Sequence, residues 1–427
     1  MQLPRWSWAP PGILQDQRKN FINVQIDAIG VGLASAASPF LPVFLARLGA
    51  TNTQVGLLTS MPGITGLVLA ILVGIFLQNR RNIVPWFSAS RLLVLSSYAS
   101  TGLAAFFVPE EHLVVTVLAI WAIATLPQTA LSVCFSVVMN AVAGSSHRYE
   151  LMSRRWTILG LTTAIMVTIA GQILDNIDFP INYQIVFLAL SVGGLISYYF
   201  SSQISLPDTP TPMLGPVKTP TGKRFSFSAS AERLRALVGK YLALIWSEKP
   251  FLRISVKRFV FFTGAVLATP LFPLYYVREV NANDAWIGFI STTQTFVTMI
   301  GYMVWARQSR KRSSRFVLLI ATFGMSLYPV LVASTQRVEL MVVFAGLAGI
   351  FQSGIDLVFF DELMRTVPEQ YSATFVSLAQ STQYASTIAA PLIGTWLAGQ
   401  IGLGWALVAS AVVRLVGACL FAFWNPK

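Results

Sequence analysis

Continuously apolar stretches, each about 20 residues long, recur along the whole 427-residue chain. A helix of that length rises ~1.5 Å per residue and spans the ~30 Å hydrocarbon core of a bilayer. The apolar residues do not alternate with polar ones, so a membrane β-barrel is excluded. Helices must then satisfy the hydrogen-bonding groups of the backbone within the lipid. The stretches predict twelve membrane spans, at residues 20–44, 54–77, 85–107, 113–141, 157–174, 184–206, 254–277, 286–306, 316–334, 338–363, 374–398 and 405–424.

Composition supports an all-α membrane protein and excludes a water-soluble one. The chain is 55% hydrophobic and only 11% charged, whereas soluble domains carry roughly 25% charged residues. Cys134 and Cys419 lie inside apolar runs, which favours a packing role over a disulfide or a metal site. The two histidines, His112 and His147, fall in loops on opposite sides of the membrane, and no phosphate-binding Gly-x-x-x-x-Gly-Lys loop is present. We therefore expect no enzyme activity, no cofactor and no metal.

Lys and Arg residues divide unevenly between the two sides that twelve spans define. The side that carries both termini holds 25 of the 30 basic residues, and the other side holds only Arg47, Arg278 and Arg337. Because basic loops stay on the cytoplasmic side, we predict a multi-pass protein of the plasma membrane with both termini cytoplasmic. The net charge of +13 then reflects topology, not a nucleic-acid partner.

A Pro-rich and then amphipathic segment separates the sixth span from the seventh. The predicted organisation is a cytoplasmic tail at 1–19, six helices at 20–206, a cytoplasmic linker at 207–253 and six helices at 254–427. Within the linker, residues 230–246 alternate apolar and basic positions at helical spacing, as in helices that lie on anionic lipid. A lipid-sensing element and a simple tether both fit this pattern, and the tether is the preferred interpretation.

An internal repeat relates the two sets of six helices. Pro39-Phe40-Leu41-Pro42 near the end of the first span is echoed 231 residues later by Pro270-Leu271-Phe272-Pro273 near the end of the seventh. In the fourth and tenth spans, Gln128 matches Gln352, which makes Ser132 the counterpart of Asp356. Two parallel six-helix halves of this kind place a shared site at their interface, near the bilayer midplane.

With this layout the sequence resembles the major facilitator superfamily of secondary transporters over nearly all of residues 18–427. The short basic loops after spans two and eight carry the resemblance, through Gly74, Arg80 and Arg81 in the first copy. The family's acidic loop position is occupied by Gln78 here and by Arg310 in the second copy. The resemblance implies that spans one, four, seven and ten line a central cavity and that the halves alternate access to it.

Two acids lie inside cavity-lining spans, where ionisable residues are costly and therefore functional candidates. Asp27 lies about two turns into the first span and shares a face with Asn20, Asn23 and Gly30. A structural role, in which Asp27 accepts hydrogen bonds from neighbouring helices, is the alternative.

Asp356, in the tenth span, shares its region with Gln352 and Ser353. Desolvation favours the protonated form of a carboxylate, and no basic residue occupies the matching repeat position, Ser132. We therefore expect Asp356 to carry a coupled proton, with Asp27 as the second candidate. A purely structural hydrogen-bonding role is again the alternative.

Polar side chains form a stripe along span four that predicts contacts with a solute. The candidate solute ligands are Gln128, Ser132, Ser136, Gln352, Ser353 and, in span eleven, Gln383. Serine hydroxyls also join helices to one another in membranes, so packing is an equal alternative for Ser132 and Ser136.

Basic residues in the second half predict a gate. The repeat places Arg258, beside Lys257, at the position of Asp27, and we expect Asp27 and Arg258 to meet when the cavity opens outward. Snorkelling of the two bases to the interface is the favoured alternative. Arg91 can snorkel similarly, whereas Arg414 near the middle of span twelve has no evident partner.

Together these features predict a secondary active transporter that moves a small organic solute by alternating access, coupled to protons. The expected partners are the solute, protons and membrane lipids, and the expected state is a monomer. The rival hypothesis is a membrane assembly or scaffold protein that keeps the fold without transport, which the altered loop motifs favour.

Overall fold

The computed structural model describes residues 15–78, 82–206, 249–366 and 372–424, and within them every regular element is a helix. The helices are α1 (Gln15–Ser35), α2 (Phe40–Arg47), α3 (Asn52–Gln78), α4 (Val84–Phe107), α5 (Glu110–Asn176), α6 (Ile181–Ser202), α8 (Lys249–Ala268), α9 (Leu271–Arg278), α10 (Asp284–Lys311), α11 (Ser314–Ala333), α12 (Val338–Thr366), α13 (Ser372–Ile401) and α14 (Leu403–Phe423). The predicted linker helix at 230–246 lies outside the described residues.

Among the described residues, nine helical segments are long and apolar enough to cross a membrane. Helices α3, α4 and α13 occupy the three remaining positions at which the sequence predicts spans. Large apolar side chains such as Phe107, Ile123 and Trp405 are 82%, 67% and 69% exposed on the outside of the molecule. Such surface is unfavourable in water and suits lipid, which confirms the all-α membrane class.

The first and seventh spans are each broken near the end by the repeated prolines. Residues 36–39 turn between α1 and α2, and Thr269 and Pro270 turn between α8 and α9. Proline lacks an N–H and clashes with the preceding helical turn, so each Pro ends one helix and starts a short second one. The sequence predicts unbroken spans here, although it contains the Pro repeat that causes the breaks.

Spans four and five form the long helix α5, which reverses direction. Phe135 and Trp156 would lie ~30 Å apart on a straight helix, yet their ring centroids are 6.4 Å apart. The two arms of α5 therefore run side by side. Backbone of helical conformation continues through the region where the sequence predicts a loop.

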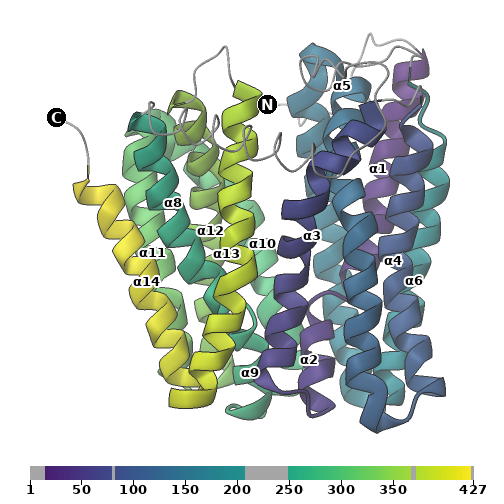
Figure 1. Ribbon diagram of the computed structural model, residues 1–427, viewed down its shortest axis with the longest axis vertical. Helices are drawn as coiled ribbons and strands as arrows, with labels where there is room; N and C mark the ends of the chain where they lie inside the picture. Colours follow the sequence, from purple (N-terminus) through teal and green to yellow (C-terminus); the bar gives the residue numbers. More distant parts are fainter. Residues whose placement is uncertain (1–14, 79–81, 207–248, 367–371, 425–427) are drawn as a thin grey trace, which may run out of the picture.

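The helices form two groups that stand side by side (Figure 1). Helix α6 packs on α1 and α4 in one group, and α14 packs on α8 and α11 in the other. Contacts between the groups run from α3 to α13, from α5 to α10 and from α2 to α9. The short helices α2 and α9 lie at the lower end of Figure 1, opposite the first turn of α1 and the last turn of α14. This end, where α2 contacts α9, is called the closed end below.

Candidate functional site

The polar face of α1 packs against α6. Asn20 donates from Nδ2 to the Ser205 carbonyl at 2.7 Å and accepts from the Ser205 amide at 2.9 Å. Farther along, Ser197 Oγ donates to Asp27 Oδ1 at 2.5 Å. Asn23 on this face remains partly exposed, and the apolar residues Ile22, Ile26, Ile29 and Leu33 are partly exposed on the other side of the helix. The polar face that the sequence identifies is therefore turned inward within its own helix group.

Asp27 is the acid of a buried charge cluster that it forms with two arginines. Arg91 Nη1 of α4 and Arg155 Nη2 of α5 lie 3.4 Å and 3.6 Å from Asp27 Oδ2, and none of the three side chains is more than 3% exposed. The guanidinium groups also lie over aromatic rings, Arg91 over Phe87 at 4.6 Å and Arg155 over Phe135 at 4.7 Å. Arg91 thus pairs internally and does not snorkel.

The gate between Asp27 and Arg258 is predicted for the state in which the cavity opens outward, and in the described conformation Asp27 is paired with other residues. Asp27 is enclosed by α1, α4, α5 and α6, and its ion pairs are with Arg91 and Arg155. In this structure Asp27 is placed to hold four helices together, which is the structural alternative that the sequence leaves open.

The basic residues at the start of the seventh span are partly or fully buried. Lys257 is 6% exposed, and its Nζ lies 5.8 Å from the Phe421 ring centroid and 6.0 Å from that of Trp424. Arg258 lies over the Phe359 ring of α12 at 5.4 Å, and its Nε and Nη1 are buried without a hydrogen-bond acceptor. Lys257 is therefore buried beside a ring of α14 and the ring of the residue that follows this helix, and its side chain does not snorkel.

Arg414 has hydrogen-bond partners in the structure that the sequence does not reveal. Its Nη1 donates to the Met325 carbonyl of α11 and its Nη2 to the Ala265 carbonyl of α8, both at 3.2 Å. Backbone carbonyls are acceptors whose identity a sequence does not encode, so this role depends on the helix packing. Arg414 joins three helices of the second group.

Asp356 accepts two hydrogen bonds and remains accessible. Tyr302 Oη of α10 donates to its Oδ2 at 2.8 Å, and Gln352 Nε2 donates to its Oδ1 at 2.7 Å. Ser353, in contrast, is fully buried and donates to the Ile350 carbonyl of its own helix. The structure therefore brings Asp356 and Gln352 together and places Ser353 in the helix contact.

Helix α12 has two exposed faces of opposite character. Leu340, Val343 and Leu347 expose an apolar face, and helical spacing places the partly exposed Gln352 and the exposed Asp356 on the other side of the helix. The apolar face suits lipid. The polar face lies on the opposite side of the helix.

The first arm of α5 repeats this arrangement. Val115, Ile123 and Leu126 expose an apolar face, while Gln128 and Ser132 are exposed on the opposite one. Ser132 Oγ donates to the Thr129 carbonyl of its own helix at 2.8 Å. Gln383 of α13 is half-buried. The side chain of Ser136 lies outside the described residues.

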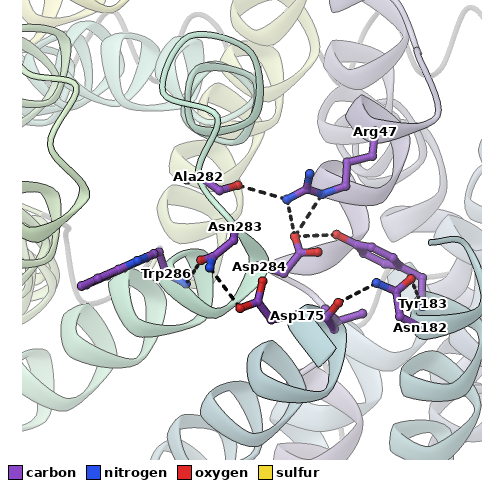
Figure 2. Close-up of polar contacts among 9 residues, drawn as sticks. Arg47, Asp175, Asn182, Tyr183, Ala282, Asn283, Asp284 and Trp286 are labelled. Atoms are coloured by element: carbon purple, nitrogen blue, oxygen red, sulfur yellow. Dashed lines mark hydrogen bonds and ion pairs between the residues drawn. The ribbon is translucent and has the colours of Figure 1, made fainter. Parts of the chain in front are cut away.

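At the closed end, a polar cluster that the sequence does not predict joins the two helix groups (Figure 2). Arg47 of α2 contacts Asp284 Oδ1 of α10 through Nε at 3.1 Å and Nη2 at 2.9 Å, and Nη2 also donates to the Ala282 carbonyl at 3.0 Å. Tyr183 Oη of α6 donates to the same Asp284 oxygen at 2.7 Å. Asp284 is 6% exposed, so this ion pair is largely removed from solvent screening.

Further bonds surround this closed-end cluster. Asn283 caps α10 by accepting from the Trp286 amide at 3.0 Å, and its Nδ2 donates to Asp175 of α5 at 3.0 Å. Arg278 of α9 donates to the Asn52 side chain and to the Ala50 carbonyl. The sequence signal for this cluster is the rarity of basic residues on this side, since both Arg47 and Arg278 belong to that small set.

The described residues contain no group of three or more His, Cys, Asp and Glu side chains that could hold a metal ion.

Comparison with known proteins finds similarity to transporters. Residues 254–427 match the family model of the Major Facilitator Superfamily. The Staphyloferrin B transporter of Staphylococcus aureus (strain NCTC 8325 / PS 47) is 24% identical over 183 residues, which is 42% of this chain and 43% of that protein. The match thus spans less than half the length of this curated relative.

Solved transporters share the fold over almost the whole chain. A mutant of the nucleoside transporter NupG has a TM-score of 0.63 at 11% identity, covering 94% of this chain and 98% of that one. The D-xylose-proton symporter has a TM-score of 0.70 at 11% identity, covering 95% and 97%. A bacterial metal transporter has a TM-score of 0.65 at 13% identity, covering 97% and 100%. At such identities the likeness establishes the fold.

Proposed function

We propose that the chain is a secondary active transporter of the major facilitator superfamily, because residues 254–427 match that family's model and solved transporters share the fold. It moves a small organic solute across the plasma membrane by alternating access, with both termini in the cytoplasm. The observation that carries the proposal is the pair of exposed polar faces on α5 and α12, each opposite a lipid-facing apolar face. Exposed polar groups within membrane spans are retained where they line a solute path.

Four side chains supply the first contacts with the solute. Gln128 and Ser132 of α5, Gln352 of α12 and Gln383 of α13 are at least partly exposed and offer amide and hydroxyl groups. Amides both donate and accept hydrogen bonds, so these residues suit a solute with several polar groups. Ser136, one turn beyond Ser132, is proposed to extend the same stripe.

The polar cluster at the closed end serves as the extracellular gate. Under the orientation given by the basic loops, Arg47 and Asp284 face the outside and close the protein to it. Outward opening requires α2 to leave α9 and Arg47 to leave Asp284, which makes the described conformation one that is closed to the exterior.

Asp356 is the proposed proton carrier. It is accessible and hydrogen-bonded by Tyr302 and Gln352, so a change in its protonation alters contacts on α10 and α12 at once. Asp27 is the less suitable candidate because it is fully buried between two arginines. Coupling arises if solute binding next to Gln352 changes the hydration of this carboxylate.

Proteoliposomes test both the transport and its coupling. We expect the wild-type protein to accumulate a solute from a labelled metabolite mixture when a pH gradient is imposed. Asp356→Asn should abolish that accumulation but keep counterflow exchange, because the amide mimics the protonated acid. Failure of the wild type to accumulate or exchange any solute would favour the transport-inactive scaffold. Accumulation by Asp356→Asn equal to the wild type would assign the proton to another group.

A further inference from the structure

Arg258 is a cation on α8, two of whose donors have no acceptor among the described residues. Its Nε and Nη1 are buried, and no acceptor lies within hydrogen-bond distance of either among the described residues. The guanidinium lies over the Phe359 ring of α12, 5.4 Å from the ring centroid. Buried donors left without acceptors are costly, and charged ones more so, so this arrangement is one that an added acceptor would stabilise.

Arg258 is directed to the polar face of α12. Gln352, Asp356 and Phe359 follow one another at a spacing of four and then three residues, which places them on a single helix face. The ring under the Arg258 guanidinium is thus on the same face as the exposed carboxamide and carboxylate. A solute that contacts Gln352 lies on the face that Arg258 approaches.

The acid on this face does not neutralise Arg258. Each Asp356 oxygen already accepts a hydrogen bond, one from Tyr302 and one from Gln352, and the described residues contain no ion pair between Asp356 and Arg258. Elsewhere among the described residues, Arg91 and Arg155 share the acid Asp27, so that cluster has one more basic than acidic side chain. A guanidinium without a paired acid attracts an incoming anion.

We propose that Arg258 binds an anionic group, a carboxylate or a phosphate, of the transported solute, so that the substrates are organic anions. This inference rests on the proposed transport function. A guanidinium offers a planar fork of N–H donors that binds either anion through two parallel hydrogen bonds. The Phe359 ring orients the guanidinium group that lies over it. Gln352 contacts an uncharged polar part of the same solute.

Binding to the purified full-length protein tests the substrate class without requiring transport. The anionic probes are succinate, citrate and glycerol 3-phosphate, and the neutral probes are succinamide and glycerol, all at one ionic strength. We expect at least one anion, and neither neutral probe, to raise the thermal midpoint of the wild type. Stabilisation by succinate or citrate indicates that the protein binds a carboxylate, and stabilisation by glycerol 3-phosphate indicates that it binds a phosphate.

Matched variants on α8 test the residue. Arg258→Gln should weaken the binding of that anion by about tenfold to a hundredfold. Arg253→Gln, which removes an equal charge from another face of the same helix, should leave it unchanged. Arg258→Lys keeps the charge but lacks the planar fork of donors, so its anion affinity should lie between those of Arg258→Gln and Arg253→Gln. This variant also tests the residue if Arg258→Gln does not fold.

Three results would overturn the inference. They are the absence of stabilisation by any of the three anions, stabilisation by the neutral probes instead, and full anion affinity in Arg258→Gln and Arg258→Lys. Uptake of neutral solutes by the wild-type protein would then leave the transport proposal standing while the anion proposal fails. Absence of all uptake, with anion binding retained, would reject transport alone.

Discussion

At the scale of single residues, the Arg91–Asp27–Arg155 cluster has an unequal charge count. One fully buried carboxylate lies near two guanidinium groups at 3.4 Å and 3.6 Å. Removing one partner of a buried ion pair is strongly destabilising because it leaves a charge uncompensated. In a cluster with one acid and two bases, the cost must depend on which member is removed.

Asp27→Asn should lower the stability by about 3–5 kcal/mol, because both arginines then lose their counterion. Arg155→Gln should be much milder, since it leaves a balanced pair of Asp27 and Arg91. The thermal midpoint of each purified variant in detergent measures the difference. Equal destabilisation by the two substitutions would show that charge balance does not govern the cluster.

Residue types and depth could be predicted from the sequence, but side-chain direction only in part. Asp27 and Asp356 are both identifiable as acids within apolar runs, yet one is enclosed and the other accessible. The difference arises from their neighbours: Ser197 on α6 and two arginines face Asp27, whereas Tyr302 and Gln352 leave Asp356 accessible. Such contacts depend on helix rotation, which periodicity does not fix when several faces carry polar residues.

At the scale of elements, helices α1 and α6 cross with their backbones in close approach. A Cβ built on Gly193 would lie 2.3 Å from the Gly30 carbonyl oxygen, and one on Gly30 would lie 2.6 Å from the Gly193 carbonyl oxygen. Small residues at a crossing let two membrane helices pack closely. This close approach allows Ser197 to reach Asp27.

Gly193→Ala should destabilise the protein by about 1–3 kcal/mol, because the added methyl group meets backbone that has no room to move. Gly399→Ala is the matched control in α13, where nothing lies within 4 Å of the added atom. There the higher helix propensity of alanine, about 1 kcal/mol, should leave stability unchanged or raise it. Comparable thermal midpoints for the two variants would contradict the close packing.

The positions of the helices were largely predictable, and their interruptions were not. Apolar length identifies the spans because lipid demands it, but it carries no information on the turns at Pro39 and Pro270 or on the continuous α5. Both depend on local backbone geometry within apolar segments. Sequence repeats mark the positions of the turns without revealing that the helix ends there.

At the scale of the whole molecule, the polar contacts between the helix groups at the closed end are the least predictable feature. Arg47 and Asp284 are 237 residues apart and meet only after both groups have folded and docked. The repeat predicts that α2 and α9 are equivalent but not that they touch. Their contact fixes which end of the molecule is closed.

Orientation in the membrane follows from the basic loops and can be tested by labelling. A cysteine at Ser313, in the exposed loop before α11, should be protected from an impermeant thiol reagent in intact cells. A cysteine at His112, exposed near the start of α5, should react. Both are placed in a background in which Cys134 and Cys419 are replaced by alanine. Reaction at Ser313→Cys with protection at His112→Cys would invert the orientation.

Alternating access is the central claim, and a reversible crosslink across the closed end tests it most directly. Asn52 of α3 and Arg278 of α9 are hydrogen-bonded across the boundary between the groups. In the cysteine-free background, Asn52→Cys with Arg278→Cys can be joined by a bifunctional methanethiosulfonate reagent, with each single cysteine as the control. Uptake into proteoliposomes should stop when the crosslink forms, stay unaffected in the controls and return when a reductant is added. Undiminished uptake by the crosslinked protein would contradict transport through separation of the two halves.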